Sequence, residues 1–416
     1  MDFHQSKDAD LVARHLQPLL KEALLDTPAV LINGPRQSGK ATLAQQCVPD
    51  FPYISLDDAT QLAVAQSDPV GFINRIDCAV IDEIQRAPGL LSAIKLSIDG
   101  DRRPGRFLLT GSANIMSLPM ISDSLAGRVE VHTLLPLSNA EITRHSPDFL
   151  QRALTQRWHD PDTAAQLIVG DSLIEHVLTG GYPEMRSRTS MRRRQAWAQS
   201  YLTTLIERDI QDVARIDDAT RIPQLMVILA MLSGQMLNLT QIGGQIGLNA
   251  HTVQRYIGIL EKLFLVRRLP AWRRHELTRL IKTPKIHFMD SGLHAALARV
   301  SPELIEADRT RFGAILESWV HGELLKTLSL TSEPWFLSHY RDKDQVEVDF
   351  VVESPLRAIL AINVKAAATV TAADFKSIRR FCDHCGEAFV SGVGLYDGRE
   401  ALPFGEDLWT VPLSYL

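Results

Sequence analysis

The most informative segment of this chain is Gly34-Pro35-Arg36-Gln37-Ser38-Gly39-Lys40-Ala41-Thr42. The apolar run 29–32 precedes it and a helix-compatible segment, 40–48, follows it. Strand, glycine-rich turn and helix form the context of a phosphate-binding loop, in which backbone amides at the helix start surround an anion. The sequence therefore predicts a nucleotide site made by these nine residues, with Lys40 on the outer phosphates.

One position departs from the phosphate-loop pattern. The residue after the lysine is normally Ser or Thr, whose hydroxyl holds Mg²⁺, but here it is Ala41. Thr42 comes one place late and would hold Mg²⁺ only if the helix start shifted. The loop is therefore a stronger indication of nucleotide binding than of hydrolysis.

Two further strand ends are predicted to complete this site. The apolar run 78–81 ends in Asp82 and Glu83, and the run 106–110 leads to Ser112 and Asn114. Downstream of a phosphate loop, Asp82 is expected to hold Mg²⁺ and Glu83 to polarise the attacking water. Ser112 or Asn114 would sense the γ-phosphate, since ligands bind at the carboxyl ends of parallel strands.

Arg128 ends the segment 124–128 just before another strand-like run. An arginine at this place either stabilises transition-state charge in a neighbouring subunit or forms a structural salt bridge. The first alternative requires at least a dimer, so a homo-oligomer is one expectation.

Composition limits the class of protein. At 416 residues, and with about 150 residues per domain, two or three domains are expected. The net charge of −5 argues against a chain coated in basic residues, although it allows a local basic patch. No apolar run approaches the ~18 residues of a membrane helix, the N-terminus has no apolar signal core, and four cysteines fit a reducing compartment. We expect a cytoplasmic protein without a membrane partner.

The motifs together resemble a prokaryotic family of AAA+-like P-loop ATPases that carry a C-terminal domain of unknown function. The resemblance rests on GPRQSGK (34–40), LDD (56–58), VIDEIQRAP (80–88), LLTGS (108–112) and SLAGR (124–128), and it continues through GGYPE (180–184), YLTTLIERD (201–209), RYIGILEKLFLVRRLPAW (255–272) and HYRDKDQVEVDFVV (339–352). It implies an α/β chain with a parallel-sheet core and with ATP and Mg²⁺ as cofactors. The family usually has threonine at position 41, so Ala41 is a departure.

We expect four regions. These are a P-loop core at 1–150, a helical lid at 151–235, a winged helix at 236–290 and an α/β nuclease-like domain at 291–416.

The third region is predicted to contact DNA. Asn249 is placed to cap a helix over 250–260 that would present His251, Thr252, Gln254 and Arg255 outward, the layout of a recognition helix. The segment 261–285 contains eight Lys or Arg and two Glu. This local charge of +6 suits binding to a phosphate backbone. The arginines expected to contact DNA are Arg267, Arg268, Arg273 and Arg274. Winged helices also pack against proteins, and that alternative stays open.

The fourth region resembles the PD-(D/E)xK nuclease superfamily. Glu317 on a helix, Asp349 on one strand and Lys365 on the next match its site, and carboxylates there would hold Mg²⁺. Position 363 should be acidic but is Asn363, which brings no charge. We expect a retained fold with a degenerate site.

Three functions are weighed on this basis. The leading one is an ATP-binding and ATP-hydrolysing AAA+-like protein that acts on DNA. The second is a nucleotide-gated switch with little turnover and a protein partner. The third is an ATP-regulated, Mg²⁺-dependent nuclease.

Overall fold

The computed structural model describes residues 11–112, 127–158, 167–209, 219–272 and 283–416. Two compact units are present. The first runs up to Leu137 and includes 262–264, and the second comprises 138–261 and 265–416. The first unit thus ends before the boundary expected at residue 150. Apart from 262–264, the described residues of the three regions expected after residue 150 fall within the second unit.

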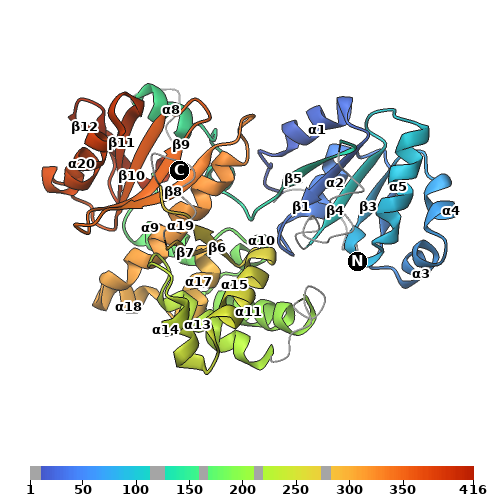
Figure 1. The fold of residues 1–416 in the computed structure, drawn as a ribbon, viewed down its shortest axis with the longest axis horizontal. Coiled ribbons are helices and arrows are strands. Elements are labelled where there is room, and N and C mark those ends of the chain that lie inside the picture. Colours follow the sequence, from blue (N-terminus) through green and yellow to red (C-terminus); the bar gives the residue numbers. More distant parts are fainter. Residues whose placement is uncertain (1–10, 113–126, 159–166, 210–218, 273–282) are drawn as a thin grey trace. The chain divides into compact units, whose positions relative to one another are not determined.

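The first unit is built on a parallel five-stranded sheet in the order β2-β3-β4-β1-β5 (Figure 1). Its strands are β1 Ala29–Asn33, β2 Tyr53–Ser55, β3 Ala79–Asp82, β4 Phe107–Gly111 and β5 Val129–Thr133. Every residue of β1, β3 and β4 is buried. Such continuous apolar runs are typical of parallel strands that are covered on both faces.

The helices of this unit are α1 Gln17–Asp26, α2 Lys40–Cys47, α3 Ala59–Ser67, α4 Pro69–Asn74 and α5 Gly89–Gly100, with a 3₁₀ turn at Ile84–Arg86. Ile94 of α5 packs in one cluster with Leu31, Ile81 and Leu109 of the central strands. Helix α1 has a proline in its first turn. This proline position favours a helix start there.

Of the helices in the described residues, most belong to the second unit. They are α7 Asn139–Thr143, α8 Phe149–Thr155, α9 Asp171–Thr179, α10 Pro183–Arg186, α11 Met191–Thr204, α13 Ile222–Met231, α14 Leu239–Ile246, α15 Ala250–Lys262, α17 Ser291–Ala298, α18 Pro302–Ala307, α19 Thr310–Leu328 and α20 Lys376–Cys385.

The GGYPE motif of this unit has a structural explanation. Gly180 has φ +67°, and a Cβ there would lie 2.5 Å from a carboxylate oxygen of Asp290. The neighbouring amide of Gly181 donates a 2.8 Å hydrogen bond to the other oxygen of Asp290. The motif therefore lets the backbone approach the buried carboxylate that also caps α17.

The segment 239–269 has the predicted order of elements. Helix α14 ends at Gly247, and the Asn249 side chain accepts a 2.8 Å hydrogen bond from the amide of Thr252 at the start of α15. The predicted cap and helix are thus confirmed. Strand β6 Val266–Leu269 then pairs in antiparallel register with β7 Lys285–Phe288.

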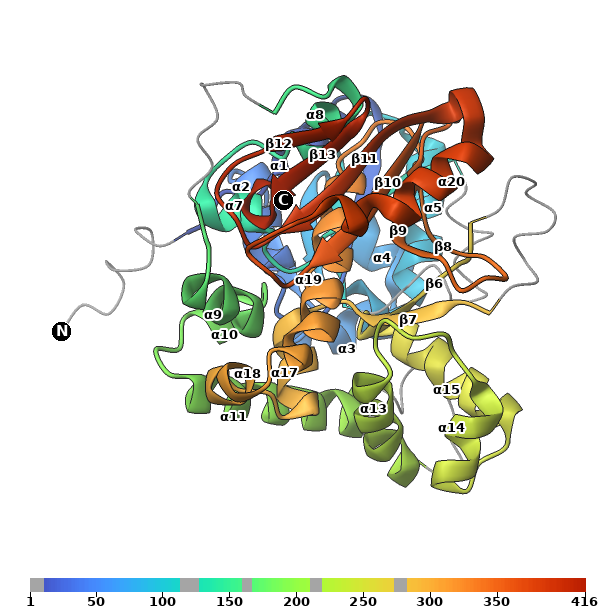
Figure 2. The same ribbon diagram turned by 90° about the vertical axis from the view of Figure 1, so that its left-hand side faces the viewer.

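The last part of the chain forms a six-stranded sheet in the order β12-β13-β11-β10-β9-β8. The strands are β8 Phe336–Arg341, β9 Glu347–Glu353, β10 Ile359–Lys365, β11 Phe389–Tyr396, β12 Leu402–Gly405 and β13 Leu408–Pro412. Helix α20 lies along one face of the sheet (Figure 2). Successive side chains of a strand point to opposite faces of the sheet, so apolar residues at consecutive positions make both of its faces apolar.

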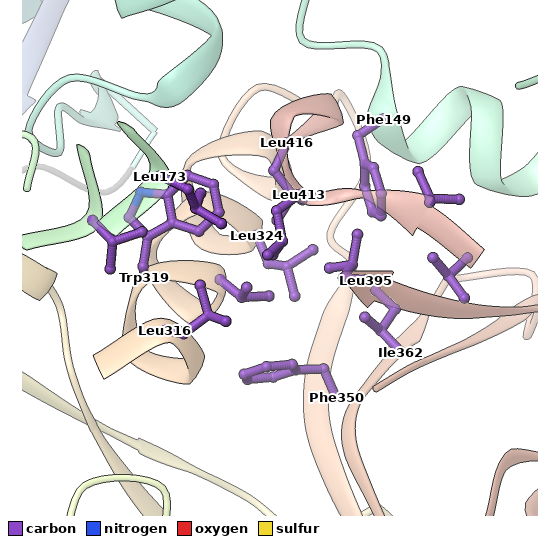
Figure 3. Packing of buried hydrophobic residues seen from close by; sticks show 14 of the residues in the cluster. Phe149, Leu173, Leu316, Trp319, Leu324, Phe350, Ile362, Leu395, Leu413 and Leu416 are labelled. Carbon is purple, nitrogen blue, oxygen red and sulfur yellow. The ribbon is translucent and has the colours of Figure 1, made fainter. Parts of the chain in front are cut away.

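The other face of this sheet is covered by α19. Phe350 and Ile362 point to the side of Leu316 and Leu324 of that helix, and Leu395 joins them (Figure 3). Strand residues one place along, such as Val351 and Ala361, belong instead to the cluster with α20. The sheet is therefore a middle layer between two helices.

Several histidines are buried in this unit. The rings of His287 on β7 and His321 on α19 stack with centroids 4.8 Å apart, and both side chains are fully buried. His294 stacks on Phe288 and one ring nitrogen lies 2.8 Å from the carbonyl oxygen of Ala230. Burial lowers the pKa of His294 to about 4 and that of His321 to about 3.

These histidines predict acid sensitivity of the second unit. An unfolded histidine has a pKa of about 6.5, so below that pH the unfolded chain binds protons that the folded chain does not. The free energy of unfolding therefore falls as the pH drops from about 6.5 toward 4, by up to about 1.4 kcal/mol per pH unit for each such histidine. Chemical denaturation at several pH values measures how steeply the free energy of unfolding depends on pH. His294→Asn should make this dependence shallower, and an unchanged dependence would contradict the contribution assigned to His294.

Candidate functional site

The phosphate loop after β1 has the backbone shape that its sequence requires. Gly34 has φ +149° and Gly39 has φ +93°. A Cβ on Gly34 would lie 2.2 Å from the carbonyl oxygen of Leu134, a distance that no side chain tolerates. The amide of Gly34 also donates a 2.9 Å hydrogen bond to the side chain of Asn33. Glycine at position 34 is therefore demanded by both conformation and space.

Lys40 lies inside this loop. Only 6% of the residue is exposed, and its ammonium group donates hydrogen bonds of 3.1 Å to the carbonyl of Gly34 and 2.7 Å to that of Pro35. The Ser38 hydroxyl donates to the same Pro35 carbonyl at 3.0 Å. Gly39 is the N-cap of α2, so Lys40 is the first residue of this helix. A phosphate group fits this cradle because ammonium, loop amides and helix terminus all favour negative charge.

Arg14 is a residue of this site that the sequence did not reveal. Its guanidinium donates a 2.7 Å hydrogen bond to the carbonyl of Ser38 and a 2.6 Å bond to that of Leu135. The residue is 9% exposed. Arg14 thus ties the phosphate loop to the chain after β5. Its sequence neighbours are mostly apolar and give no indication of this role.

Asp82 ends β3 and is held on both carboxylate oxygens. The Tyr53 hydroxyl donates to one oxygen at 2.7 Å, and the Thr110 hydroxyl donates to the other. Burial, followed by the hydrogen bond to Asp82, raises the pKa of Tyr53. Asp82 is 8% exposed. Its carboxylate has the chemistry to hold Mg²⁺ beside a nucleotide, but neither hydroxyl partner was predicted.

Glu83 follows in a left-handed conformation, with φ +58°. Its amide donates a 3.2 Å hydrogen bond to Thr110, and its carboxylate accepts one of 3.0 Å from the Ser112 hydroxyl. The Gln85 side chain donates to that same carboxylate and, at 2.7 Å, to Ser112. The structure thus brings the predicted Ser112 next to Glu83. Asn114 lies outside the described residues.

The substitution at position 41 is not offset by its neighbour. Helix α2 begins at Lys40, so the start of the helix is not shifted, and the Thr42 residue is exposed. Of the other loop residues, Pro35 is buried, Arg36 is half-buried and Gln37 is exposed.

Arg128 forms an ion pair within its own unit. Its guanidinium nitrogens lie 2.8 and 3.2 Å from the two carboxylate oxygens of Asp99 on α5. This hydrogen bond raises the pKa of Arg128 and lowers that of Asp99. Of the two alternatives for this arginine, the salt bridge is the one seen in the single chain.

The residues predicted to contact DNA differ in exposure. His251, Gln254 and Arg255 of α15 are exposed and Thr252 is half-buried. The opposite face, made by Val253, Tyr256, Ile257 and Leu260, is buried.

The arginines that follow α15 have different surroundings. Arg267 on β6 is exposed. Arg268 is paired with Glu261, whose carboxylate oxygens each lie 3.0 Å from the guanidinium Nε. Arg273 and Arg274 lie outside the described residues. Trp272 is buried and donates a 3.1 Å hydrogen bond to Glu353, so it belongs to the core and cannot stack on a base.

The nuclease-like residues are brought partly together. The Asp349 amide donates a 3.3 Å hydrogen bond to the Asn363 side chain, and the Asp349 carboxylate accepts one of 2.8 Å from Val364. Burial, together with the nearby Asp349 carboxylate, raises the pKa of Glu317, and burial raises that of Asp349. Lys365 points to Asp374, with which it forms a 3.1 Å ion pair.

Lys285 of β7 is the unpredicted member of this group. It is 2% exposed, and its ammonium contacts the Glu347 carboxylate. Although burial opposes its charge, the carboxylates of Asp349, Glu317 and Glu347 together raise its pKa. Among the residues that the structure describes, no group of three or more His, Cys, Asp or Glu side chains is arranged to hold a metal ion.

Three family models match the chain. An AAA domain matches residues 26–143, and two domains of unknown function, DUF8612 and DUF4143, match residues 170–304 and 312–416. The AAA match and the parallel five-stranded sheet support a P-loop core of the AAA type in the first unit. Nucleotide binding is the property that this core implies.

Two curated relatives are uncharacterized proteins of Mycobacterium bovis and Mycobacterium tuberculosis. Each is 29% identical over 340 residues, which is 80% of this chain and 69% of the relative.

Similar solved structures include a DNA replication initiation factor, the Bacillus subtilis clamp loader delta protein and C. elegans PCH-2. Their identities are 12%, 12% and 14% and their TM-scores 0.28, 0.25 and 0.21. The matches cover 79%, 76% and 58% of this chain and 100%, 97% and 66% of those chains, so the chain spans just under two thirds of PCH-2. TM-scores at this level do not establish a common fold.

In the described part of the chain, no helix combines the length and apolarity needed to cross a bilayer.

The contacts of Arg14 predict a loss of nucleotide affinity on its removal. Arg14→Ala removes two charge-assisted hydrogen bonds to the frame of the loop, so we expect ATP to bind at least about tenfold more weakly, or about 1.4 kcal/mol. Calorimetric titration with ATP measures this. Lys21→Ala, at an exposed position of α1, is the control with the same loss of charge. Equal affinities of both variants would refute the role of Arg14.

Proposed function

We propose that this chain is an ATP-hydrolysing AAA+-like protein that acts on DNA through α14, α15 and the β6–β7 hairpin, and that its nuclease-like C-terminal domain does not cleave DNA. One observation carries the ATPase part. The buried ammonium of Lys40 sits in a glycine-shaped loop, in the same parallel sheet whose β3 ends in Asp82 and Glu83. This combination is what phosphoryl transfer requires of a protein.

The roles of the residues follow from their positions. Lys40 and the loop amides would hold the β- and γ-phosphates, and Asp82 would hold Mg²⁺, which neutralises the charge that develops on the phosphates. Glu83 would orient the attacking water, since Gln85 and Ser112 hold its carboxylate. Arg14 would keep the loop in shape.

A second function has specific support. Ala41 offers no hydroxyl to Mg²⁺, and the unshifted start of α2 leaves Thr42 exposed. The absence of one Mg²⁺ ligand reduces turnover more than binding, because the metal acts mainly on the transition state. A nucleotide-gated switch, with a protein partner in place of DNA or with a second copy of the chain, would have this property.

Turnover of ATP separates the two functions. For the ATPase we expect Mg²⁺-dependent phosphate release that Lys40→Ala abolishes and Ala41→Thr increases. Glu83→Gln should keep ATP binding and trap unhydrolysed nucleotide. Phosphate release and retention of radiolabelled ATP measure these properties, with and without duplex DNA.

Thr42→Ala is the matched control for Ala41→Thr, because it changes a neighbouring exposed position of the same helix. It should leave turnover unchanged. Absence of turnover in the native chain, with turnover restored by Ala41→Thr, would favour the switch.

The proposed contact with DNA rests on exposure and charge. Gln254 and Arg255 point away from the buried face of α15, and Arg267 is exposed on the adjoining hairpin. The local charge of +6 from 261 to 285 stands out in a chain of net charge −5, but Lys285, one of its eight cations, is buried against Glu347 and contributes nothing to this surface. Arg268 contributes less, since Glu261 neutralises it.

Charge reversal tests this surface. Arg255→Glu with Arg267→Glu should weaken binding of duplex DNA at least about tenfold and lower the salt dependence, by about 0.9 in slope for each phosphate that the variant no longer neutralises. Fluorescence anisotropy at several salt concentrations measures both quantities. Arg192→Glu with Arg193→Glu, two exposed positions of α11, makes the same change in net charge elsewhere. Equal effects of both pairs would show that the binding is not specific to this surface.

A further inference from the structure

A lysine from outside the nuclease-like sheet reaches into its carboxylate site. Lys285 belongs to β7 of the hairpin, yet its ammonium contacts Glu347 on β9. Arg341 on β8 adds a second cation, with 3.5 Å between its guanidinium and the other oxygen of Glu347. The Glu347 carboxylate therefore already has two cationic partners supplied by the protein.

The position of Lys285 is set by the packing of β7 against α19. Lys285 and His287 are two residues apart on a strand and so share one face, while Glu317 and His321 are four apart on a helix and share another. His287 stacks on His321 with centroids 4.8 Å apart. This contact brings the preceding pair, Lys285 and Glu317, into register, so the ammonium is aimed at the carboxylates.

The remaining residues offer a divalent cation fewer ligands than the nuclease pattern does. Mg²⁺ demands six oxygen ligands in near-octahedral geometry. Asn363 brings no charge; its oxygen accepts from the Asp349 amide, and its nitrogen donates a 2.8 Å hydrogen bond to Ser377. Lys365, which would orient water, is engaged with Asp374. The acidic and basic groups that the nuclease pattern needs are therefore used for internal contacts.

We infer that the Lys285 ammonium takes the place of the divalent cation, so that Glu317 of α19 and Glu347 and Asp349 of β9 bind the β6–β7 hairpin to the helix and the sheet instead of supporting phosphodiester cleavage. The inference rests on the nuclease-like assignment within the proposed function. It gives the degenerate site a role, because the hairpin with Arg267 is then held to the C-terminal sheet by a buried ion-pair group. Removing one partner of such a group leaves uncompensated buried charge.

Manganese binding tests the inference. Mn²⁺ is titrated into the full-length chain without nucleotide, and free Mn²⁺ is followed by electron paramagnetic resonance. All variants carry Asp82→Asn, which removes the other proposed metal ligand. We expect that the chain with native Lys285 shows no binding that depends on Asp349. Lys285→Met should gain Mn²⁺ affinity by at least tenfold, and Asp349→Asn added to it should abolish the gain.

Lys285→Arg is the matched control, because it keeps the cation and should not bind Mn²⁺. Mn²⁺ binding by the native Lys285 chain that Asp349→Asn removes would overturn the inference, as would a folded Lys285→Met chain without any gain. If Lys285→Met fails to fold, the comparison of native and Asp349→Asn chains still decides. ATP turnover is measured separately, so loss of the proposed ATPase function would be distinguishable from failure here.

Discussion

The passage of Gly34 past the carbonyl of Leu134 is the constraint on which the first unit depends. Strand β1 lies between β4 and β5, and its chain must turn at once into α2 while the segment after β5 passes close by. Only a residue without a Cβ fits there. The turn then places Lys40 within the loop, and Arg14 bonds the Ser38 carbonyl of the loop. The conformation of one glycine thus shapes the whole phosphate cradle.

The acid pair beside this cradle shows how hydrogen bonds prepare a site. Thr110 of β4 contacts both the Asp82 carboxylate and the Glu83 amide, so one hydroxyl relates the two acids to each other. Ser112 and Gln85 hold the Glu83 carboxylate. Groups held in this way need little reorganisation when charge develops in a reaction. The missing hydroxyl at Ala41 affects the metal, whereas the framework around the acids is intact.

The second unit uses buried charge differently. Lys285, Glu317 and Asp349 form a polar group between a hairpin, a helix and a sheet, and neutral histidines pack next to it. Buried charges retain their partners because isolation would be strongly unfavourable. The same carboxylates that resemble a metal site therefore stabilise the packing of the hairpin, the helix and the sheet against one another. A fold can keep the geometry of a catalytic site after its chemistry has been replaced.

Local sequence determined the phosphate loop, the acids at the end of β3, the Asn249 cap and the buried face of α15. These features depend on residue types at short, fixed spacing, and the energies of turns, caps and periodic burial act over a few residues. Tertiary structure alone decided the roles of Arg14, Tyr53 and Lys285, the pairing of Arg128 with Asp99 and the burial of Trp272. Each of these results from contacts between distant segments, such as Arg14 with Leu135 or Lys285 with Glu347. A local pattern cannot specify such contacts, because long side chains select among partners only once the layers have packed.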